Sequence, residues 1–210
     1  MRSEPDHVHR EPMPGPMGPA AFEEAYAGAP PWDIGRPQPA FLALSEGGAV
    51  QGRVLDVGCG TGEHPLMAAG LGLEATGVDV AANALRRAER KARERGLTAR
   101  FLRHDARNLD GLGEAFDTVL DCGLFHIFQE EERAVYVASL YSVLAPGGRY
   151  LMLGFSDRQP EGWGPHRLAR EDVTAAFARG WRLDAIEPAT IDVTIDPGGV
   201  SAWLVTATRI

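Results

Sequence analysis

Several features are scarce in this chain of 210 residues. It has two cysteines, Cys59 and Cys122, one lysine, Lys91, and no apolar run approaching the roughly 18 residues of a membrane span. Two cysteines do not make a disulfide framework, and reduced thiols fit a reducing compartment. The N-terminus MRSEPDHVHREPMPGPMGP lacks the apolar core of a secretory signal. We therefore expect a cytoplasmic protein with no membrane partner.

Positive charge is also in short supply, with 21 Lys and Arg against 29 Asp and Glu and a net charge of −8. Because neutralising phosphates dominates nucleic-acid affinity, an acidic chain without a basic run argues against a DNA or RNA partner. His7 and His9 could chelate a metal, but two histidines on a mobile tail make a poor site, so we expect no metal. The oligomeric state stays open.

The chain divides into a tail and one domain. Residues 1–20 are rich in Pro, Gly and Met without periodicity, which predicts disorder, and residues 21–210 have the length of a single domain. Within it, short β-rich runs alternate with amphipathic helical runs, and this predicts an α/β, Rossmann-like, doubly wound, mostly parallel sheet. Two final β-rich runs joined by DPGG predict a terminal antiparallel hairpin. The seven expected strands are 53–58, 73–80, 98–105, 117–123, 149–156, 181–195 and 200–210.

The stretch VLDVGCGTGEH (54–64) carries the strongest local signal. A buried strand reaches Asp56, and Gly58, Gly60 and Gly62 alternate before a helix, so the backbone can turn tightly and approach a ligand closely. A purely structural turn is the alternative interpretation. The spacing D-x-G-x-G-x-G differs from the dinucleotide pattern G-x-G-x-x-G, which disfavours a nicotinamide oxidoreductase.

Two acids follow the next strands. Asp79 closes the second strand, where a carboxylate is placed to accept hydrogen bonds from both hydroxyls of a ribose. Asp105 ends the third strand, where its side chain and the N–H of Ala106 could recognise an adenine edge. Each acid could singly be an exposed loop residue. Three acids and three glycines at successive strand ends together favour a nucleoside site.

At these residues the chain resembles the class I S-adenosylmethionine-dependent methyltransferases. The resemblance runs from about residue 30 to the C-terminus and includes the glycine loop, Asp79, Asp105, the L-x-P-G-G turn (144–148) and the terminal hairpin. It implies S-adenosylmethionine as cofactor, with its methionine part on the glycine loop, its ribose on Asp79 and its adenine at Asp105. The residues expected to bind the cofactor are Trp32, Arg36, Asp56, Gly58, Cys59, Gly60, Gly62, Asp79, Val80, Asp105, Ala106 and Asp121.

Three segments resemble one branch of that superfamily, the thiopurine and tellurite-resistance methyltransferases with bacterial members that methylate heterocyclic toxins, hydroxyquinolones and quinols. They are PPWDIGRPQP (30–39), LDCGLFHIF (120–128) and GFSDRQPEGWGPHRL (154–168). The resemblance implies that residues 21–47 form a lid, with Trp32 against cofactor or substrate and Asp33 or Arg36 fixing the lid or meeting the cofactor's charged end. The alternative is a proline-rich strap with Trp32 as a hydrophobic plug and a local Asp33–Arg36 ion pair.

Methyl transfer is an in-line displacement in which positioning supplies much of the catalysis, and a phenol gains from a base. His126, after the fourth strand, is the best expected base, with His166 second; the alternatives are a histidine that orders a helix and a surface residue. Aromatic side chains could stack on a flat substrate or simply pack the core or the lid. The expected substrate contacts are Trp32, Phe125, His126, Phe155, Asp157 and Trp163.

The sequence thus predicts an S-adenosylmethionine-dependent methyltransferase acting on a small molecule, with O- or N-methylation of an aromatic heterocycle or phenol favoured. A thiol or halide methyltransferase and a non-catalytic cofactor-binding protein are the alternatives. Cytosine-C5 methyltransferases require Pro-Cys at the nucleophile position. Cys122 lies in an Asp-Cys-Gly context, so that class of enzyme is disfavoured. The acceptor atom stays open.

Overall fold

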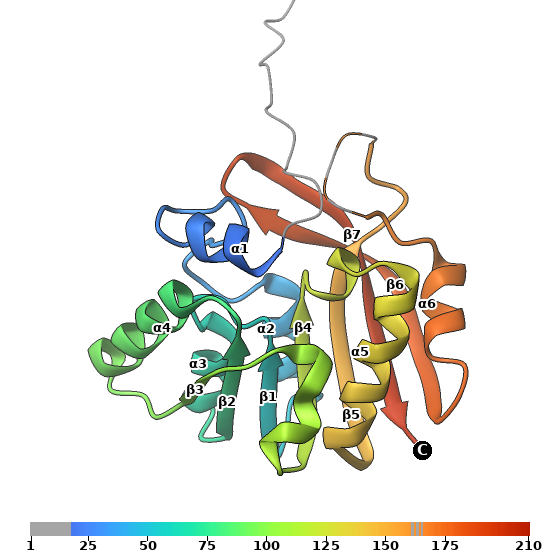
Figure 1. Cartoon of the computed structure of the whole chain (residues 1–210), viewed down its shortest axis with the longest axis horizontal. Helices are drawn as coiled ribbons and strands as arrows, with labels where there is room; N and C mark the ends of the chain where they lie inside the picture. Colours follow the sequence, from blue (N-terminus) through green and yellow to red (C-terminus); the bar gives the residue numbers. More distant parts are fainter. Residues whose placement is uncertain (1–17, 161, 163, 165) are drawn as a thin grey trace, which may run out of the picture.

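The computed structural model describes residues 18–160, 162, 164 and 166–210. Its centre is a seven-stranded sheet in the order β3-β2-β1-β4-β5-β7-β6 (Figure 1). The first five strands run parallel, and β7 is antiparallel to both of its neighbours. This confirms the predicted fold class. The strands are β1 (Arg53–Val57), β2 (Glu74–Asp79), β3 (Arg100–Arg103), β4 (Phe116–Cys122), β5 (Leu144–Phe155), β6 (Trp181–Val193) and β7 (Asp196–Arg209).

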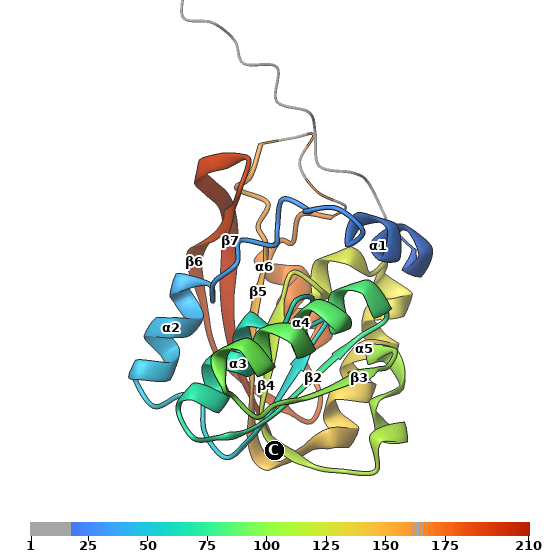
Figure 2. The same cartoon turned by 90° about the vertical axis from the view of Figure 1, so that its left-hand side faces the viewer.

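Helices cover both faces of the sheet, and Figure 2, which views the molecule from its β3 side, shows α2 on one side and α5 on the other. An acidic first turn in α5 suits the helix dipole, and Gln129 and Glu132 form a capping box at its start. The helices are α1 (Pro19–Ala25), α2 (Pro39–Glu46), α3 (Glu63–Gly70), α4 (Ala82–Arg95), α5 (Glu130–Val143) and α6 (Arg170–Ala176), with short 3₁₀ turns η1 (Ala106–Leu112) and η2 (Phe125–Ile127). None of these described helices is long and apolar enough to cross a membrane.

The core has two layers because side chains alternate between the faces of a strand. Leu55 and Val57 of β1 belong to the layer that includes Tyr136 and Leu140 of α5. Val54, one residue away, belongs to the other layer, which includes residues of α2 and α3. A shift of one residue therefore moves a side chain to the other face of the sheet, and this decides the surroundings of each acid at a strand end.

Two predicted boundaries differ from the structure. α1 begins at Pro19, inside the tail predicted to be disordered, whereas residues 1–17, with His7 and His9, lie outside the described residues. The terminal hairpin turns at residues 194–195 rather than at DPGG, because Val193 pairs with Asp196. The glycines of DPGG instead lie in an irregularity of β7, where Gly199 has a φ of 67°.

Residues 26–38, here named the strap, link α1 to α2 and lie over the carboxyl ends of the central strands (Figure 1). Its second half is bound to β6. The amide side chain of Gln38 brackets the backbone of Asp192, donating to its carbonyl at 3.0 Å and accepting from its N–H at 2.8 Å. The N–H of Thr194 donates to the carbonyl of Pro31 at 2.8 Å. The terminal hairpin thus supports the strap.

Candidate functional site

The glycine loop connects β1 to α3, and its three alternating glycines all have positive φ, with values of 67°, 52° and 83°. Close packing also requires glycine at two of them. A Cβ on Gly60 would stand 2.5 Å from the Tyr26 hydroxyl oxygen, and a Cβ on Gly62 would stand 2.8 Å from atoms of Ala88 and Phe101. The loop therefore presents bare backbone at the edge of the sheet where the strands end.

Asp79 holds this loop in place. One carboxylate oxygen accepts from the N–H of Gly60 and the other from the N–H of Ala81, each at 2.8 Å. Burial raises the pKa of Asp79, and the backbone N–H groups partly offset this. A carboxylate has about four lone-pair sites, so two remain for other donors.

A cavity of about 160 Å³, here named the β2 cavity, opens beside Asp79. Its wall includes five residues that the sequence assigns to one ligand, and the fold brings them together from the ends of β1, β2 and β3. They are Gly58, Asp79, Val80, Asp105 and Ala106.

Asp105 is engaged by a neighbour that the sequence reasoning missed. Arg107 donates to both carboxylate oxygens, from Nε at 3.1 Å and from a terminal nitrogen at 2.9 Å. These bonds lower the pKa of Asp105. Arg107 also pairs with Glu132 at 2.9 Å and lies over the ring of Phe128. The pair could have been predicted from the sequence HDAR, in which Arg107 follows Asp105 by two residues.

A second cavity of about 150 Å³, here named the strap cavity, lies between the strap, the glycine loop and the end of β4. Of the expected site residues it brings together Trp32, Arg36, Gly58, Cys59, Gly60, His126 and Phe155. Phe22, Gly58, Leu124 and Ile127 line both cavities, so the two are adjoining parts of one cleft.

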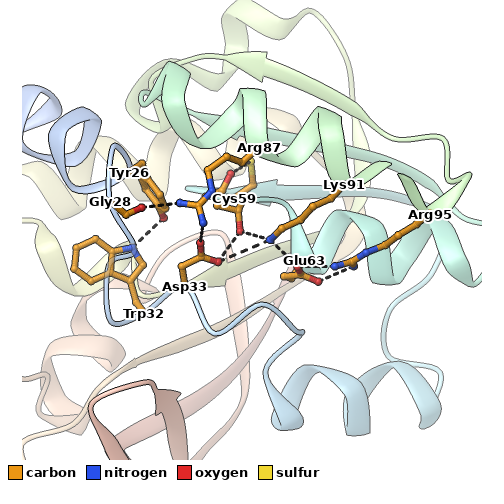
Figure 3. A network of polar contacts seen from close by, with 11 residues as sticks. Tyr26, Gly28, Trp32, Asp33, Cys59, Glu63, Arg87, Lys91 and Arg95 are labelled. Atoms are coloured by element: carbon orange, nitrogen blue, oxygen red, sulfur yellow. Dashed lines mark hydrogen bonds and ion pairs between the residues drawn. The ribbon is translucent and has the colours of Figure 1, made fainter. Parts of the chain in front are cut away.

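The strap is held over this cleft by a charge network that begins at Asp33 (Figure 3). Asp33 accepts from the Thr61 hydroxyl at 2.7 Å and pairs with Arg87 of α4 at 2.9 Å. Lys91, the single lysine, donates to Thr61 and to Glu63 at 2.6 and 2.7 Å. Burial raises the pKa of Glu63, but its bonds to Arg95 and Lys91 outweigh this and lower it. Strap, glycine loop and α4 therefore form one connected unit.

Trp32 and Arg36 also secure the strap. The indole N–H of Trp32 donates to the Tyr26 hydroxyl at 2.9 Å, and its ring meets those of Phe22 and Tyr26 edge to face. Arg36 pairs with Asp192 of β6 at 2.6 Å. The local Asp33–Arg36 pair of the alternative interpretation is not formed, because Asp33 pairs with α4 and Arg36 with β6.

His126 lies at the floor of the strap cavity and is 5% exposed. Its Nδ1 accepts from the backbone N–H of Phe155 at 3.0 Å, and the two rings are 4.2 Å apart. Burial lowers the pKa of His126 to about 3. The imidazole is neutral at ordinary pH, and its Nδ1 lone pair points at a backbone amide.

Among the described residues, six expected site residues line neither cavity. One is Gly62, whose Cβ position faces Ala88 and Phe101. Asp121 faces the α5 layer and accepts four internal hydrogen bonds, from the N–H groups of Leu124 and Phe125 and the hydroxyls of Tyr136 and Tyr150. Burial raises its pKa to about 6. Asp121 lines neither cavity because the register of β4, with Asp121 level with Val57, turns its side chain toward the α5 layer.

The other four lie in the core or beside the cleft. Phe125 is fully buried and stacks on Phe177. Asp157 is exposed. His166 is half-buried, with burial lowering its pKa. Asp56 points at His64, whose Nδ1 lies 3.6 Å from the carboxylate. The prediction for Trp163 falls outside the described residues.

The residues present fit a nucleoside cofactor. The glycine loop is a cradle that a side chain would fill, and acids stand at the ends of three neighbouring strands. Neither oxygen of Asp56 has a hydrogen-bond partner in the described part of the chain, and burial raises its pKa. Asp56 lines neither cavity, and His64 partly offsets the effect of burial on its pKa.

Comparison with known proteins agrees with this geometry. A family model described as a methyltransferase domain matches residues 54–148. The chain is 39% identical over 171 residues to the 2-heptyl-1-hydroxyquinolin-4(1H)-one methyltransferase of Mycobacteroides abscessus, covering 80% of this chain and 75% of that protein. It is 30% identical over 146 residues to a probable thiol methyltransferase 2 of Arabidopsis thaliana, covering 68% of this chain and 64% of that protein.

A solved structure from work on the conversion of a disulfide bond into a thioacetal group during echinomycin biosynthesis has a TM-score of 0.83 at 36% identity, covering 91% of this chain and 93% of that one. These similarities confirm the resemblance inferred from the glycine loop and from the acids at the strand ends. The chain belongs to the S-adenosylmethionine-dependent methyltransferases.

Proposed function

We propose that this enzyme methylates an oxygen or nitrogen of a small aromatic heterocycle or phenol. The strap cavity carries the proposal, because it adjoins the glycine loop and its wall suits a flat apolar ring. The identity to a relative named for a hydroxyquinolone supports the same substrate class. The apolar and aromatic wall consists of Phe22, Tyr26, Trp32, Ile34, Ile127, Phe155, Ile191 and Val193.

S-adenosylmethionine, when bound, supplies an electrophilic methyl group. We assign its nucleoside to the β2 cavity, where Asp79 has two lone-pair sites left for ribose hydroxyls and Ala106 borders the adenine position. Its methionine part belongs on the glycine loop, between the two cavities.

Residues 21–47 act in this proposal as the lid over the cleft. The strap closes the strap cavity from above, and its bonds to α4 and β6 keep it in place. Closure excludes water and holds the acceptor in line with the methyl group, and these are the two terms from which methyl transfer gains most. The tail before Gly18 has no part in the proposal.

A thiol or halide acceptor is the second candidate, and one observation favours it. The acids of the strap cavity, Asp33 and Glu63, are paired with cations, and burial holds His126 neutral with its Nδ1 lone pair occupied. His64, which also lines the cavity, accepts from the N–H of Gln38 on Nε2 and faces Asp56 through Nδ1. The cavity thus lacks an evident free base among its described residues. A thiol with a pKa near 8.5 needs little help to ionise and a halide needs none.

S-adenosylhomocysteine release with a panel of 1-hydroxyquinolin-4(1H)-ones, phenols, thiols and iodide distinguishes the two. We expect kcat/KM for the best hydroxylated heterocycle to exceed that for any thiol or iodide by about tenfold or more. Asp79→Ala serves as the control for release that does not depend on the cofactor site. The reverse ranking would make the thiol or halide function the better one.

A further inference from the structure

His126 is fixed from two sides, so the roles of its two nitrogens follow from their neighbours. The N–H of Phe155 can only donate, and Nδ1, 3.0 Å away, must therefore carry a lone pair. In a neutral imidazole the proton then sits on Nε2. Burial lowers the pKa of His126, and the nearby positive charges of His166 and Arg133 lower it further.

The Nε2–H group has no hydrogen-bond partner in the described part of the chain, and the residue lines the strap cavity. A general base needs a lone pair directed at the proton it removes. The lone pair of His126 is directed instead at a backbone amide on β5. What the ring offers to the cavity is a donor.

We propose that His126 is a fixed hydrogen-bond donor to the oxygen of the methyl acceptor, and that it selects acceptors whose oxygen binds as an anion. This inference rests on the proposed function and replaces the base expected from sequence. It narrows the substrate class to acidic hydroxyls on aromatic heterocycles, since these ionise without help from the enzyme.

The reaction balances without a proton on the enzyme. The acceptor hydroxyl loses its proton to water, and the Nε2–H of His126 stabilises the oxygen anion. An oxygen lone pair forms the new C–O bond while the bond between methyl carbon and sulfur breaks, with its electron pair passing to sulfur. The products are the methyl ether and S-adenosylhomocysteine, and His126 keeps its proton throughout.

His126→Gln and His126→Asn form a matched pair, because neither amide can act as a base. The longer glutamine can carry an N–H to about the place of Nε2, whereas asparagine reaches only the place of Nδ1. With a 1-hydroxyquinolin-4(1H)-one, we expect His126→Gln to keep kcat/KM within about tenfold of wild type and His126→Asn to lose about 100-fold. Equal and deep losses in both folded variants would overturn the donor role.

Nitrogen-15 NMR of the full-length wild-type protein, labelled at histidine, tests the tautomer without any substrate. The His126 signal is identified by its absence from His126→Gln. We expect an unprotonated Nδ1 and a protonated Nε2, unchanged between pH 5.5 and pH 8. A proton on Nδ1, or titration in that range, would overturn the proposal even if the enzyme is active. Failure of every acceptor in the panel would count against the proposed function alone.

The pH dependence of kcat/KM with two acceptors of different acidity completes the test. A donor predicts that the inflection follows the acceptor's own pKa and persists in His126→Gln. A base predicts one inflection common to both acceptors, which disappears in that variant. The second result would return His126 to the role expected from sequence.

Discussion

Asp79 and Asp121 lie at the carboxyl ends of the two strands that flank β1, and both are buried, at 8% and 0% exposed. Asp79 accepts one backbone N–H on each oxygen and lines the β2 cavity. Asp121 accepts two backbone N–H groups and two tyrosine hydroxyls and lines neither cavity. The same residue type at equivalent strand ends thus has two different tasks.

The difference lies in how many lone-pair sites the protein itself occupies. A carboxylate has about four, and Asp121 uses all of them internally while Asp79 uses two. Asp121 therefore secures the turn after β4 to α5 and β5. Asp79 secures the glycine loop and still has capacity for a ligand.

Replacing Asp by Asn at each of the two positions separates these tasks, and the largest expected effect is at Asp79. Asp79→Asn puts an NH₂ group against one of the backbone N–H donors, so we expect the affinity for S-adenosylhomocysteine to fall about 100-fold, roughly 3 kcal/mol. Asp121→Asn is the matched control and should change that affinity less than about threefold. Isothermal titration calorimetry measures both, and equal losses would contradict the comparison.

A second change disturbs the glycine loop at its closest contact. In Gly60→Ala the new Cβ meets the Tyr26 hydroxyl at a positive φ of 52°, and we expect a loss of stability of about 2 kcal/mol with weaker cofactor binding. Gly48→Ala is the control for positive φ alone, since a Cβ there meets nothing within 4 Å. Tyr26→Phe should partly rescue Gly60→Ala. Urea denaturation measures the free energy of unfolding of the three single variants and of the double variant Tyr26→Phe/Gly60→Ala. If Tyr26→Phe does not reduce the loss caused by Gly60→Ala, the hydroxyl contact is unimportant.

The third prediction concerns pH and Asp121. Its folded-state pKa of about 6 lies above the ordinary value, so the folded state binds the extra proton and the group's contribution to stability falls as pH rises from about 4 to 6. Asp121→Asn does not titrate. We expect the variant to be less stable than wild type by about 1 kcal/mol more at pH 5 than at pH 8. Denaturant melts at both pH values measure this, and a pH-independent difference would contradict the raised pKa.

The features predicted correctly from the sequence are those that depend on the order of strands and helices along the chain. Alternating β-rich and helical runs predict the sheet, and the residues directly after β1, β2 and β3 gather in one cavity because parallel strands end at the same edge. Asp79, Val80 and Ala106 therefore line the same cavity. Residues of the strap also line the cleft.

What the sequence could not predict depends on register and on distant partners. Asp121 is level with Val57 of β1, and this register turns it toward the tyrosines of the α5 layer. Gln38 meets Asp192 across a separation of 154 residues. The tautomer of His126 depends on a backbone N–H 29 residues away. Each of these is a matter of tertiary geometry, which local pattern does not encode.

The smallest expected effect tests whether the two anchors of the strap are equivalent. Arg36 and Asp192 form an ion pair whose side chains are 55% and 31% exposed, whereas the Asp33 side chain is only 6% exposed and binds both Thr61 and Arg87. Exposed pairs contribute little because water and salt screen them. Arg36→Ala should cost less than about 0.5 kcal/mol in urea denaturation and leave acceptor KM within about twofold. Asp33→Asn should raise that KM several-fold, because it loosens the strap from the glycine loop. If both variants behave alike, the strap is held mainly by its hydrogen bonds to the backbone of residues 192 and 194, and the charge network on α4 has another purpose.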